Sequence, residues 1–429
     1  KESSGVYNNS TGTIELGEKL TEEEIANNEN PKAVPKITGV KYGVYNVNGT
    51  FKYFDGVITG KIGNSIYLYV TEKEDGYEIV KNVNLDSEGN QTETETATLQ
   101  KVAIAEISVN DTETNLGRYF NVTELRNALK DLEITDTVYK LKILANFSID
   151  AKESSLTIPE GVNILMDLNG KTIDCSNMST IINNGKMSIM DSDESKNGII
   201  SNGAYGKSDS YNNVIYNNGI MVVNSGTIKI TGNNYARAIY NNGEVEINNG
   251  NILVNKGTTN STNTTNLIYN VGKLKINDGV LKTNNPYGIY NDNEGKVEIN
   301  GGTISINSGE NAYGVYNKET GTIKMTGGTI SARGYNSSYY YSYGIYNVKG
   351  DLNLIGGTIE SNGHNYYTYG VYNNSGNVGI NGTTINSNGR GVVNKTGKVE
   401  MTAGEITASY YNGIENNTGT VRITDGTII

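Results

Sequence analysis

A short motif with an apolar first residue and an asparagine third residue recurs through most of the chain. Its copies begin at Ile181, Ile215, Ile239, Ile268, Ile289, Val315, Ile345, Val371, Val392 and Ile414. After a first gap of 34 residues, successive copies begin 21 to 30 residues apart. This spacing is typical of the coils of a solenoid, in which each repeat packs only on its neighbours.

Each copy is followed by two short stretches in which apolar and polar residues alternate. In one coil these stretches are 295–299 and 302–306, and each opens with a glycine. A period of two places Val297 and Ile299 on one side of a strand and Glu298 on the other. Because glycine turns the chain at positive φ without a steric clash, we expect the glycines at the corners. The pattern predicts three short strands per coil and an all-β fold, a right-handed parallel β-helix.

Stacking of the coils about 4.8 Å apart would place equivalent residues above one another. The asparagine of the motif would then lie inside the corner, where its amide can bond from coil to coil. We expect this internal ladder at Asn217, Asn241, Asn270, Asn291, Asn317, Asn347, Asn373, Asn394 and Asn416. The outward middle position predicts a tyrosine column at Tyr216, Tyr240, Tyr269, Tyr290, Tyr316, Tyr346 and Tyr372. A further outward column, Glu246, Lys275, Glu298 and Lys324, alternates in charge and favours one register of the coils.

The repeat also marks the ends of the segments along the chain. Because the motif occurs at Val6 and Val44, residues 1–63 are expected to be the C-terminal coils of a preceding β-helix. Residues 64–117 lack the motif and predict an intervening β module with a hairpin at Asp75-Gly76. Within the repeats, insertions gather directly before the motif, as in residues 334–342. One corner of the solenoid should therefore carry the variable loops.

A capping helix is predicted in residues 118–140, ahead of the main β-helix at 141–429. Asn121 and Glu124 have the spacing of a capping box, and Leu125 and Leu129 fall on one helical face. Such a helix can cover the open end of the first coil, where bare strand edges would otherwise be exposed.

Residues 119–173 resemble the capped start of pectate-lyase-like parallel β-helix repeat domains in cell-surface, adhesin-like proteins of Gram-positive bacteria. The resemblance rests on Leu-Thr-Ile-Pro-Glu-Gly at 156–161 and Met-Asp-Leu-Asn-Gly-Lys-Thr-Ile at 166–173, and the repeats extend it to residue 429. It implies a β-helix on the outside of a bacterial cell with an adhesive or structural role.

Composition narrows the set of partners. Only 36% of the 429 residues are hydrophobic, which suits thin repeated layers better than one large core. The net charge is −11 with no cluster of Lys and Arg, so nucleic acid is not expected as a partner. No run of 18 apolar residues occurs, so we expect no membrane insertion. The single cysteine, Cys175, leaves no disulfide framework and no cysteine zinc site.

Catalytic chemistry has few candidate residues. His364 is the only histidine and lies in a loop, so no triad can be built on a second one. The acidic stretch Asp191-Ser192-Asp193-Glu194 could hold calcium or form a solvated turn. Outward carboxylates alternate with lysines and do not pair as glycosidase carboxylates do. We therefore expect no enzyme, no cofactor, and no catalytic or metal site.

The expected function is a non-enzymatic structural or adhesive segment of an extracellular bacterial surface fibre. If a second copy followed residue 429, the spacing from Ile414 to its Val6 would be 21 residues, so head-to-tail repetition with further copies is expected. The alternative is a carbohydrate-binding or polysaccharide-degrading β-helix of the lyase or tailspike kind. The tyrosine column, with loop residues such as Tyr366 and Tyr367, is either a platform for host or matrix glycans or a self-stabilising aromatic ladder.

Overall fold

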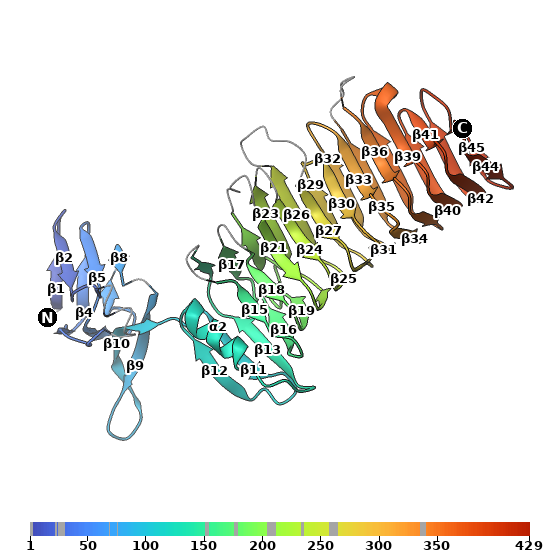
Figure 1. Cartoon of the computed structure of the whole chain (residues 1–429). Coiled ribbons are helices and arrows are strands. Elements are labelled where there is room, and N and C mark those ends of the chain that lie inside the picture. Colours follow the sequence, from blue (N-terminus) through green and yellow to red (C-terminus); the bar gives the residue numbers. More distant parts are fainter. Residues whose placement is uncertain are drawn as a thin grey trace. The chain divides into compact units, whose positions relative to one another are not determined.

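The computed structural model describes the chain apart from residues 1–2, 22–23, 25–30, 68, 75, 151–153, 176–178, 204–211, 233–235, 257–264 and 335–339. Two compact units, Lys1–Ala103 and Ile104–Ile429, are built almost entirely of β-strands (Figure 1). Their boundary falls inside residues 64–117, the segment that lacks the motif. Asp75 of the expected hairpin and much of the insertion at 334–342 lie outside the described residues. No helix in the described part of the chain is long and apolar enough to cross a membrane.

The second unit is a parallel β-solenoid in which successive strands of each coil join three walls (Figure 1). The tyrosine wall contains β15 (Leu156–Ile158), β18 (Ile181–Asn183), β21 (Asn212–Asn217), β24 (Ala236–Asn241), β27 (Asn266–Asn270), β30 (Tyr287–Asn291), β33 (Ala312–Asn317), β36 (Ser342–Asn347), β39 (Thr368–Asn373), β41 (Arg390–Asn394) and β43 (Ile414–Asn416). From β18 onward its strands contain the motif copies that the sequence predicted, so the solenoid fold is confirmed. The right hand of its coil stays a prediction.

The other two walls follow in each coil. The charged wall contains β16 (Asn163–Asp167), β19 (Lys186–Met190), β22 (Ile220–Val223), β25 (Glu244–Ile247), β28 (Lys273–Ile276), β31 (Lys296–Ile299), β34 (Thr322–Met325), β37 (Asp351–Leu354), the first parts of β40 (Asn377–Ser387) and β42 (Lys398–Ala408), and β44 (Thr420–Ile423). The third wall contains β17 (Thr172–Cys175), β20 (Ile199–Asn202), β23 (Thr227–Gly232), β26 (Asn251–Lys256), β29 (Val280–Thr283), β32 (Thr303–Asn307), β35 (Thr329–Arg333), β38 (Thr358–Asn362), the later parts of β40 and β42, and β45 (Thr427–Ile428).

Each coil adds one apolar layer to a continuous core. In the coil formed by β30, β31 and β32, the inward residues Ile289, Val297 and Ile304 are at most 2% exposed. Outward neighbours such as Glu298 face solvent, as the alternation predicted. Burial of such side chains stabilises the fold by about 1.5–3 kcal/mol each.

The motif asparagines form one hydrogen-bonded ladder inside the corner between the tyrosine wall and the charged wall. From Asn183 to Asn416, each side-chain Nδ2 donates to the Oδ1 of the asparagine in the next coil at 2.7 to 3.0 Å. The same Nδ2 of Asn317 also donates to the Gly321 carbonyl at 2.9 Å. These amides give the corner carbonyls a second donor, since the Gly321 carbonyl also accepts from the Asp351 amide of the next coil at 3.3 Å, and most of the amides are completely buried.

A small antiparallel sheet and a helix begin the second unit. The strands β11 (Ala105–Val109), β12 (Asn115–Tyr119) and β13 (Val138–Ile143) precede β14 (Phe147–Ile149), and helix α2 (Val122–Lys130) lies between β12 and β13. The Asn121 side chain accepts from the Glu124 amide at 2.8 Å, which is the predicted cap. Leu125 and Leu129 of α2 join the solenoid core, so the predicted helix is confirmed.

The first unit is a shorter set of coils. Three parallel ladders join β1 (Ser4–Asn8) with β4 (Tyr42–Asn46) and β7 (Ile66–Tyr67); β2 (Thr13–Leu16) with β5 (Thr50–Tyr53) and β8 (Glu72–Lys73); and β3 (Lys36–Thr38) with β6 (Val57–Lys61). An antiparallel pair, β9 (Tyr77–Leu85) and β10 (Gln91–Lys101), extends the last ladder. Asn8 and Asn46 repeat the internal ladder with a 2.9 Å bond.

Candidate functional site

The seven motif tyrosines form one column along the tyrosine wall. Their ring centroids lie 4.6 to 5.3 Å apart from coil to coil, with ring planes 8 to 28° from parallel. Each ring therefore packs its faces against the rings above and below.

A second tyrosine column, which the sequence reasoning missed, stands beside the first. It contains Tyr287, Tyr313, Tyr343 and Tyr369, stacked at 4.8 to 5.1 Å. Each of these rings meets the motif tyrosine of its own coil at 72 to 88°. The signal was present in the chain, because Tyr-Gly precedes the motif in these four coils.

Two arginines belong to the second column: Arg390 directly follows Tyr369, and Asn266 separates Arg237 from Tyr287. Strand register places Arg237 and Arg390 in the same column as the four tyrosines. The Arg237 guanidinium lies 4.0 Å from the centroid of the Tyr269 ring, and that of Arg390 lies 5.6 Å from the centroid of Tyr369. A guanidinium over a ring face is attractive because the face carries negative charge density. Each arginine thus adds a cation–π contact to the aromatic columns.

The close packing of the two tyrosine columns favours a self-stabilising aromatic ladder over a platform that binds sugars. Burial raises the pKa of Tyr287 to about 12 and raises the pKa of Tyr313 and Tyr343 further. Tyr343 is only 7% exposed. Since a sugar ring binds an aromatic side chain through an open ring face, these stacked rings offer it little surface.

The Asp292 carboxylate ties the tyrosine wall to a corner loop and makes its stability depend on pH. Burial raises the pKa of Asp292, but hydrogen bonds from Tyr269 and the Asn293 amide and the charge of Lys318 bring it below its usual value. The Tyr269 hydroxyl donates to Asp292 at 2.5 Å, and Lys318 lies 3.1 Å away. A carboxylate with a lowered folded pKa contributes stability above its unfolded pKa, and that stability is lost as pH falls through the folded pKa.

We therefore expect Asp292→Asn to lower the free energy of unfolding at pH 7 by about 1.5 kcal/mol. The difference between the variant and the natural protein should shrink below about pH 4, because protonation removes the same charge from Asp292. Urea denaturation followed from pH 7 to pH 2.5 measures both curves. Parallel curves over this range would contradict the assignment.

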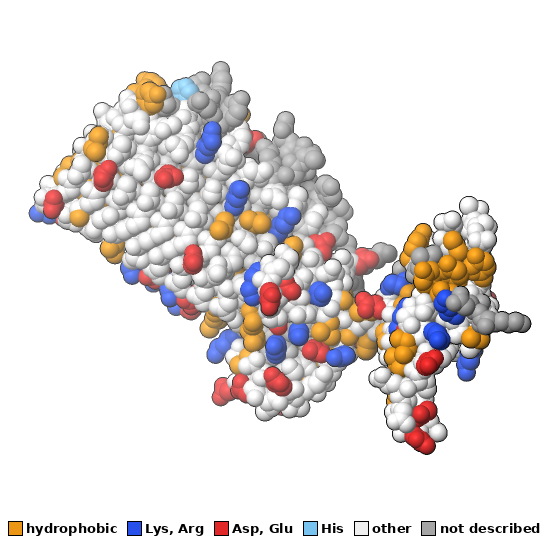
Figure 2. Space-filling view, turned by 180° about the vertical axis from the view of Figure 1, so that it is seen from behind, with side chains coloured by type: hydrophobic (Ala, Val, Ile, Leu, Met, Phe, Trp, Pro, Cys, Tyr) orange, Lys and Arg blue, Asp and Glu red, His pale blue; other side chains and the backbone are white. Residues whose placement is uncertain are grey.

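Solvent-exposed tyrosine rings lie instead at the loop corner near the C-terminal coils. This corner cluster contains Tyr341, Tyr366, Tyr367, Tyr369, Arg390 and Tyr411. Tyr366 is 53% exposed and Tyr411 is 37% exposed. Figure 2 shows hydrophobic side chains beside the single, pale blue histidine of the chain. These residues come from the loops after β35, β38 and β42 and from strands β39 and β41.

Arg390 organises the corner cluster. Its Nε donates to Glu415 at 2.7 Å, and its Nη1 donates to the Tyr366 carbonyl at 2.7 Å. The guanidinium lies 4.6 Å from the centroid of the Tyr411 ring and 5.6 Å from that of Tyr366. Exposed aromatic faces beside fixed polar groups are the combination that binds the apolar faces and hydroxyls of a sugar.

His364 has a structural contact in this corner. Its Nδ1 accepts from the Tyr366 amide at 3.4 Å and caps the short 3₁₀ helix η1 (Asn365–Tyr367). The ring lies 6.0 Å from that of Tyr367. His364 therefore positions the loop that presents Tyr366.

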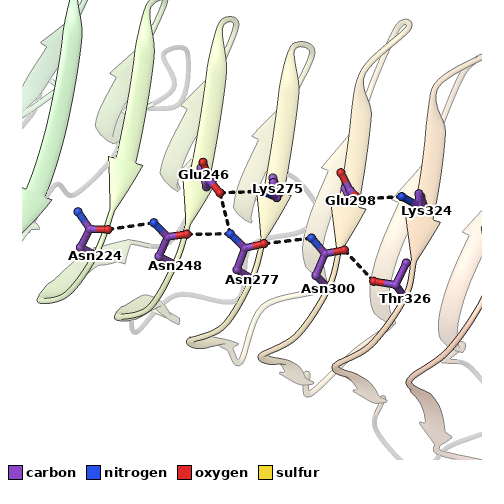
Figure 3. Close-up of polar contacts among 9 residues, drawn as sticks. All are labelled: Asn224, Glu246, Asn248, Lys275, Asn277, Glu298, Asn300, Lys324 and Thr326. Atoms are coloured by element: carbon purple, nitrogen blue, oxygen red, sulfur yellow. Dashed lines mark hydrogen bonds and ion pairs between the residues drawn. The ribbon is translucent and has the colours of Figure 1, made fainter.

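The charged wall carries paired side chains and a second, external amide ladder (Figure 3). Lys275 contacts Glu246 and Lys324 contacts Glu298, each at 2.9 Å. The external ladder, absent from the sequence reasoning, runs through Asn224, Asn248, Asn277, Asn300 and Thr326. A groove of about 390 Å³ is lined by these ion pairs and their neighbours. Its carboxylates are bound to lysines, and the hydrogen bonds from Lys275 and Asn277 lower the pKa of Glu246.

In the acidic stretch at 191–194, Asp191 and Asp193 accept hydrogen bonds from backbone amides. Asp191 accepts from the Gly170 amide at 2.7 Å and from the Gly198 amide at 2.6 Å. Asp193 accepts from the Ser195 amide at 3.0 Å. Within the described residues, no group of three or more acidic, histidine or cysteine side chains is placed to hold a metal ion.

Comparison with known proteins identifies a family. The model of a family described as carbohydrate-binding domain-containing proteins matches residues 150–413, well over half of the chain. No curated protein and no solved structure matches. The matched residues include most of the solenoid, both tyrosine columns and the tyrosines and arginine of the corner cluster. The chain belongs to the family of carbohydrate-binding domain-containing proteins.

Proposed function

We propose that this chain is a non-catalytic, carbohydrate-binding segment of a bacterial surface protein and that the corner cluster contacts the sugar. The observation that carries the proposal is the exposure of the Tyr366 and Tyr411 rings, each of which has the fixed guanidinium of Arg390 over one face. Family membership supports binding of carbohydrate. The proposal combines the two functions expected from the sequence: the adhesive role is carried out by binding carbohydrate.

A binding role without turnover is supported by the pairing of the carboxylates. On the charged wall, Glu246 and Glu298 are held by lysines in the next coil, and Glu400 lies between Lys398 and Arg422. Hydrolysis of glycosidic bonds requires a carboxylic acid and a carboxylate facing one sugar, and paired ionised carboxylates cannot supply the acid.

The extracellular location in this proposal is supported by the resemblance of the sequence to repeat domains of Gram-positive, adhesin-like proteins. Few apolar side chains and abundant amides and hydroxyls on the walls fit a solvated exterior. The role in a fibre and the head-to-tail repetition with further copies of the chain stay predictions.

Removal of the open rings tests the binding surface. We expect Tyr366→Ala and Tyr411→Ala each to weaken binding of a glycan selected on an array by about tenfold, because an exposed aromatic anchor is lost. Isothermal titration with the whole chain measures the change. Tyr69→Ala is the matched control, since Tyr69 is 64% exposed in the other unit. Equal affinity of all three variants and the natural protein would exclude the corner cluster as the site.

A further inference from the structure

A polar groove of about 750 Å³ opens at the same loop corner. It is lined by the residues at the ends of four third-wall strands: Asn307, Ser308, Gly309, Arg333, Gly334, Asn362, Gly363 and Asn388. Strand register stacks Asn307, Arg333 and Asn362 in one column. The groove therefore runs across successive coils, along the axis of the solenoid.

Backbone contacts hold the groove open. The Ser308 amide donates to the Arg333 carbonyl at 2.9 Å, and the Gly334 amide donates to the Asn362 carbonyl at 3.2 Å. A Cβ at Gly334 would lie 3.0 Å from the Tyr341 carbonyl oxygen, and one at Gly363 would lie 3.0 Å from the Thr368 hydroxyl. Side chains at these two positions would crowd the corner, so the lining is backbone, amide and guanidinium.

The charge of the groove differs from that of the charged wall. Its described lining includes one cation, Arg333, and no carboxylate. Arg333 is exposed. In the groove of the charged wall, by contrast, Lys275 and Lys324 lie at 2.9 Å from glutamates. Because the chain carries a net charge of −11, an anion gains no general attraction and needs a local cation.

The groove and the corner cluster belong to the same loops. The chain runs from Gly363 through His364 to Tyr366, and from Asn388 through Gly389 to Arg390. Gly334 packs against the backbone of Tyr341. The loop corner thus presents the exposed rings of Tyr366 and Tyr411 and, beside them, a groove lined by side-chain amides and the Arg333 guanidinium.

We propose that the groove is a subsite for a sugar that carries a carboxylate and belongs to an oligosaccharide bound at the corner cluster. The Arg333 guanidinium binds the carboxylate, since its planar fork matches two carboxylate oxygens. The side-chain amides of Asn307, Asn362 and Asn388 bind sugar hydroxyls as donors and acceptors. This inference rests on the proposed function and adds the chemical class of the ligand.

The test compares a linear oligosaccharide of uronic acids with the same oligosaccharide whose carboxyl groups are reduced to hydroxymethyl groups. Titration calorimetry with the whole chain should show tighter binding of the acidic form. Arg333→Gln should weaken binding of the acidic form by about tenfold and leave the reduced form unchanged, because a hydrogen bond to a charged group is lost. Lys282→Gln is the matched control: it removes an exposed cation of the third wall outside the groove and should change neither affinity.

Three results would overturn the subsite. They are equal affinity of the natural protein for the two forms, equal loss for both forms in Arg333→Gln, and unchanged affinity for the acidic form in that variant. If the reduced form binds and Tyr366→Ala weakens it, the proposed function stands without the acidic subsite. If neither form binds the natural protein and no glycan is retained on an array, the proposed function fails as well.

Discussion

Replacement of Asn317 by leucine is expected to lower the free energy of unfolding of the solenoid by about 3 kcal/mol. Asn317 is completely buried, and its Nδ2 donates to Gly321 and to Asn347 while its Oδ1 accepts from Asn291. Leucine keeps the branched shape but is larger and removes these bonds, so the buried Asn347 amide oxygen loses its donor, while the Gly321 carbonyl keeps only the Asp351 amide at 3.3 Å. A buried acceptor without a donor costs about 1–3 kcal/mol.

The external ladder supplies the matched control. Asn277 donates to Asn248 and to Glu246 and accepts from Asn300 at 2.7 to 3.0 Å, but its side chain lies at the surface of the charged wall (Figure 3). Water can replace those bonds, so Asn277→Leu should change stability by less than about 0.5 kcal/mol. Urea denaturation followed by tyrosine fluorescence measures both variants. Equal destabilisation by the two substitutions would show that burial does not decide the strength of the ladder.

The second large effect is expected at Gly344, where we predict a loss of about 3 kcal/mol for Gly344→Ala. A Cβ there would lie 2.3 Å from Cγ2 of Ile359 and 2.5 Å from the Gly370 carbonyl oxygen. Ile359 cannot move without leaving the core, and the Gly370 carbonyl belongs to the next coil. The coils would have to separate locally to accept one methyl group.

Gly203 tests whether the clash, and not the loss of glycine, causes the effect. A Cβ at Gly203 meets no atom of the described residues within 4 Å, so Gly203→Ala should be neutral or slightly stabilising. Thermal unfolding by calorimetry compares the two variants. A Gly344→Ala protein as stable as Gly203→Ala would mean that the coil spacing adjusts freely.

Repeated positions could be predicted from the sequence because each has the same neighbours in every coil. The tyrosine column, the asparagine positions and the strands all follow from one period and from the alternation of inward and outward residues. The second tyrosine column was visible in the Tyr-Gly pairs at 287, 313, 343 and 369. It was missed because strict alternation of inward and outward residues would place Tyr287, three positions before the outward Tyr290, in the core. In β30 both Gly288 and Ile289 are buried, so the alternation breaks between them and both tyrosines of the coil face outward, while the register of the strand pair is unbroken.

The corner cluster could not be predicted in the same way. Tyr366, Arg390 and Tyr411 come from three different coils, and two of them lie in loops whose lengths vary from coil to coil. Without a common period, the sequence does not say which loop residues meet. The contacts of Arg390 with Glu415 and with three tyrosine rings appear only once the coils are stacked.

The most direct test of carbohydrate binding without turnover is a crystal structure of the whole chain with an oligosaccharide retained from a glycan array. We predict an intact oligosaccharide whose sugar ring packs on Tyr366 or Tyr411 at the loop corner. Retention of no glycan, or a cleaved oligosaccharide in the groove of the charged wall beside Glu246 and Glu298, would contradict this function.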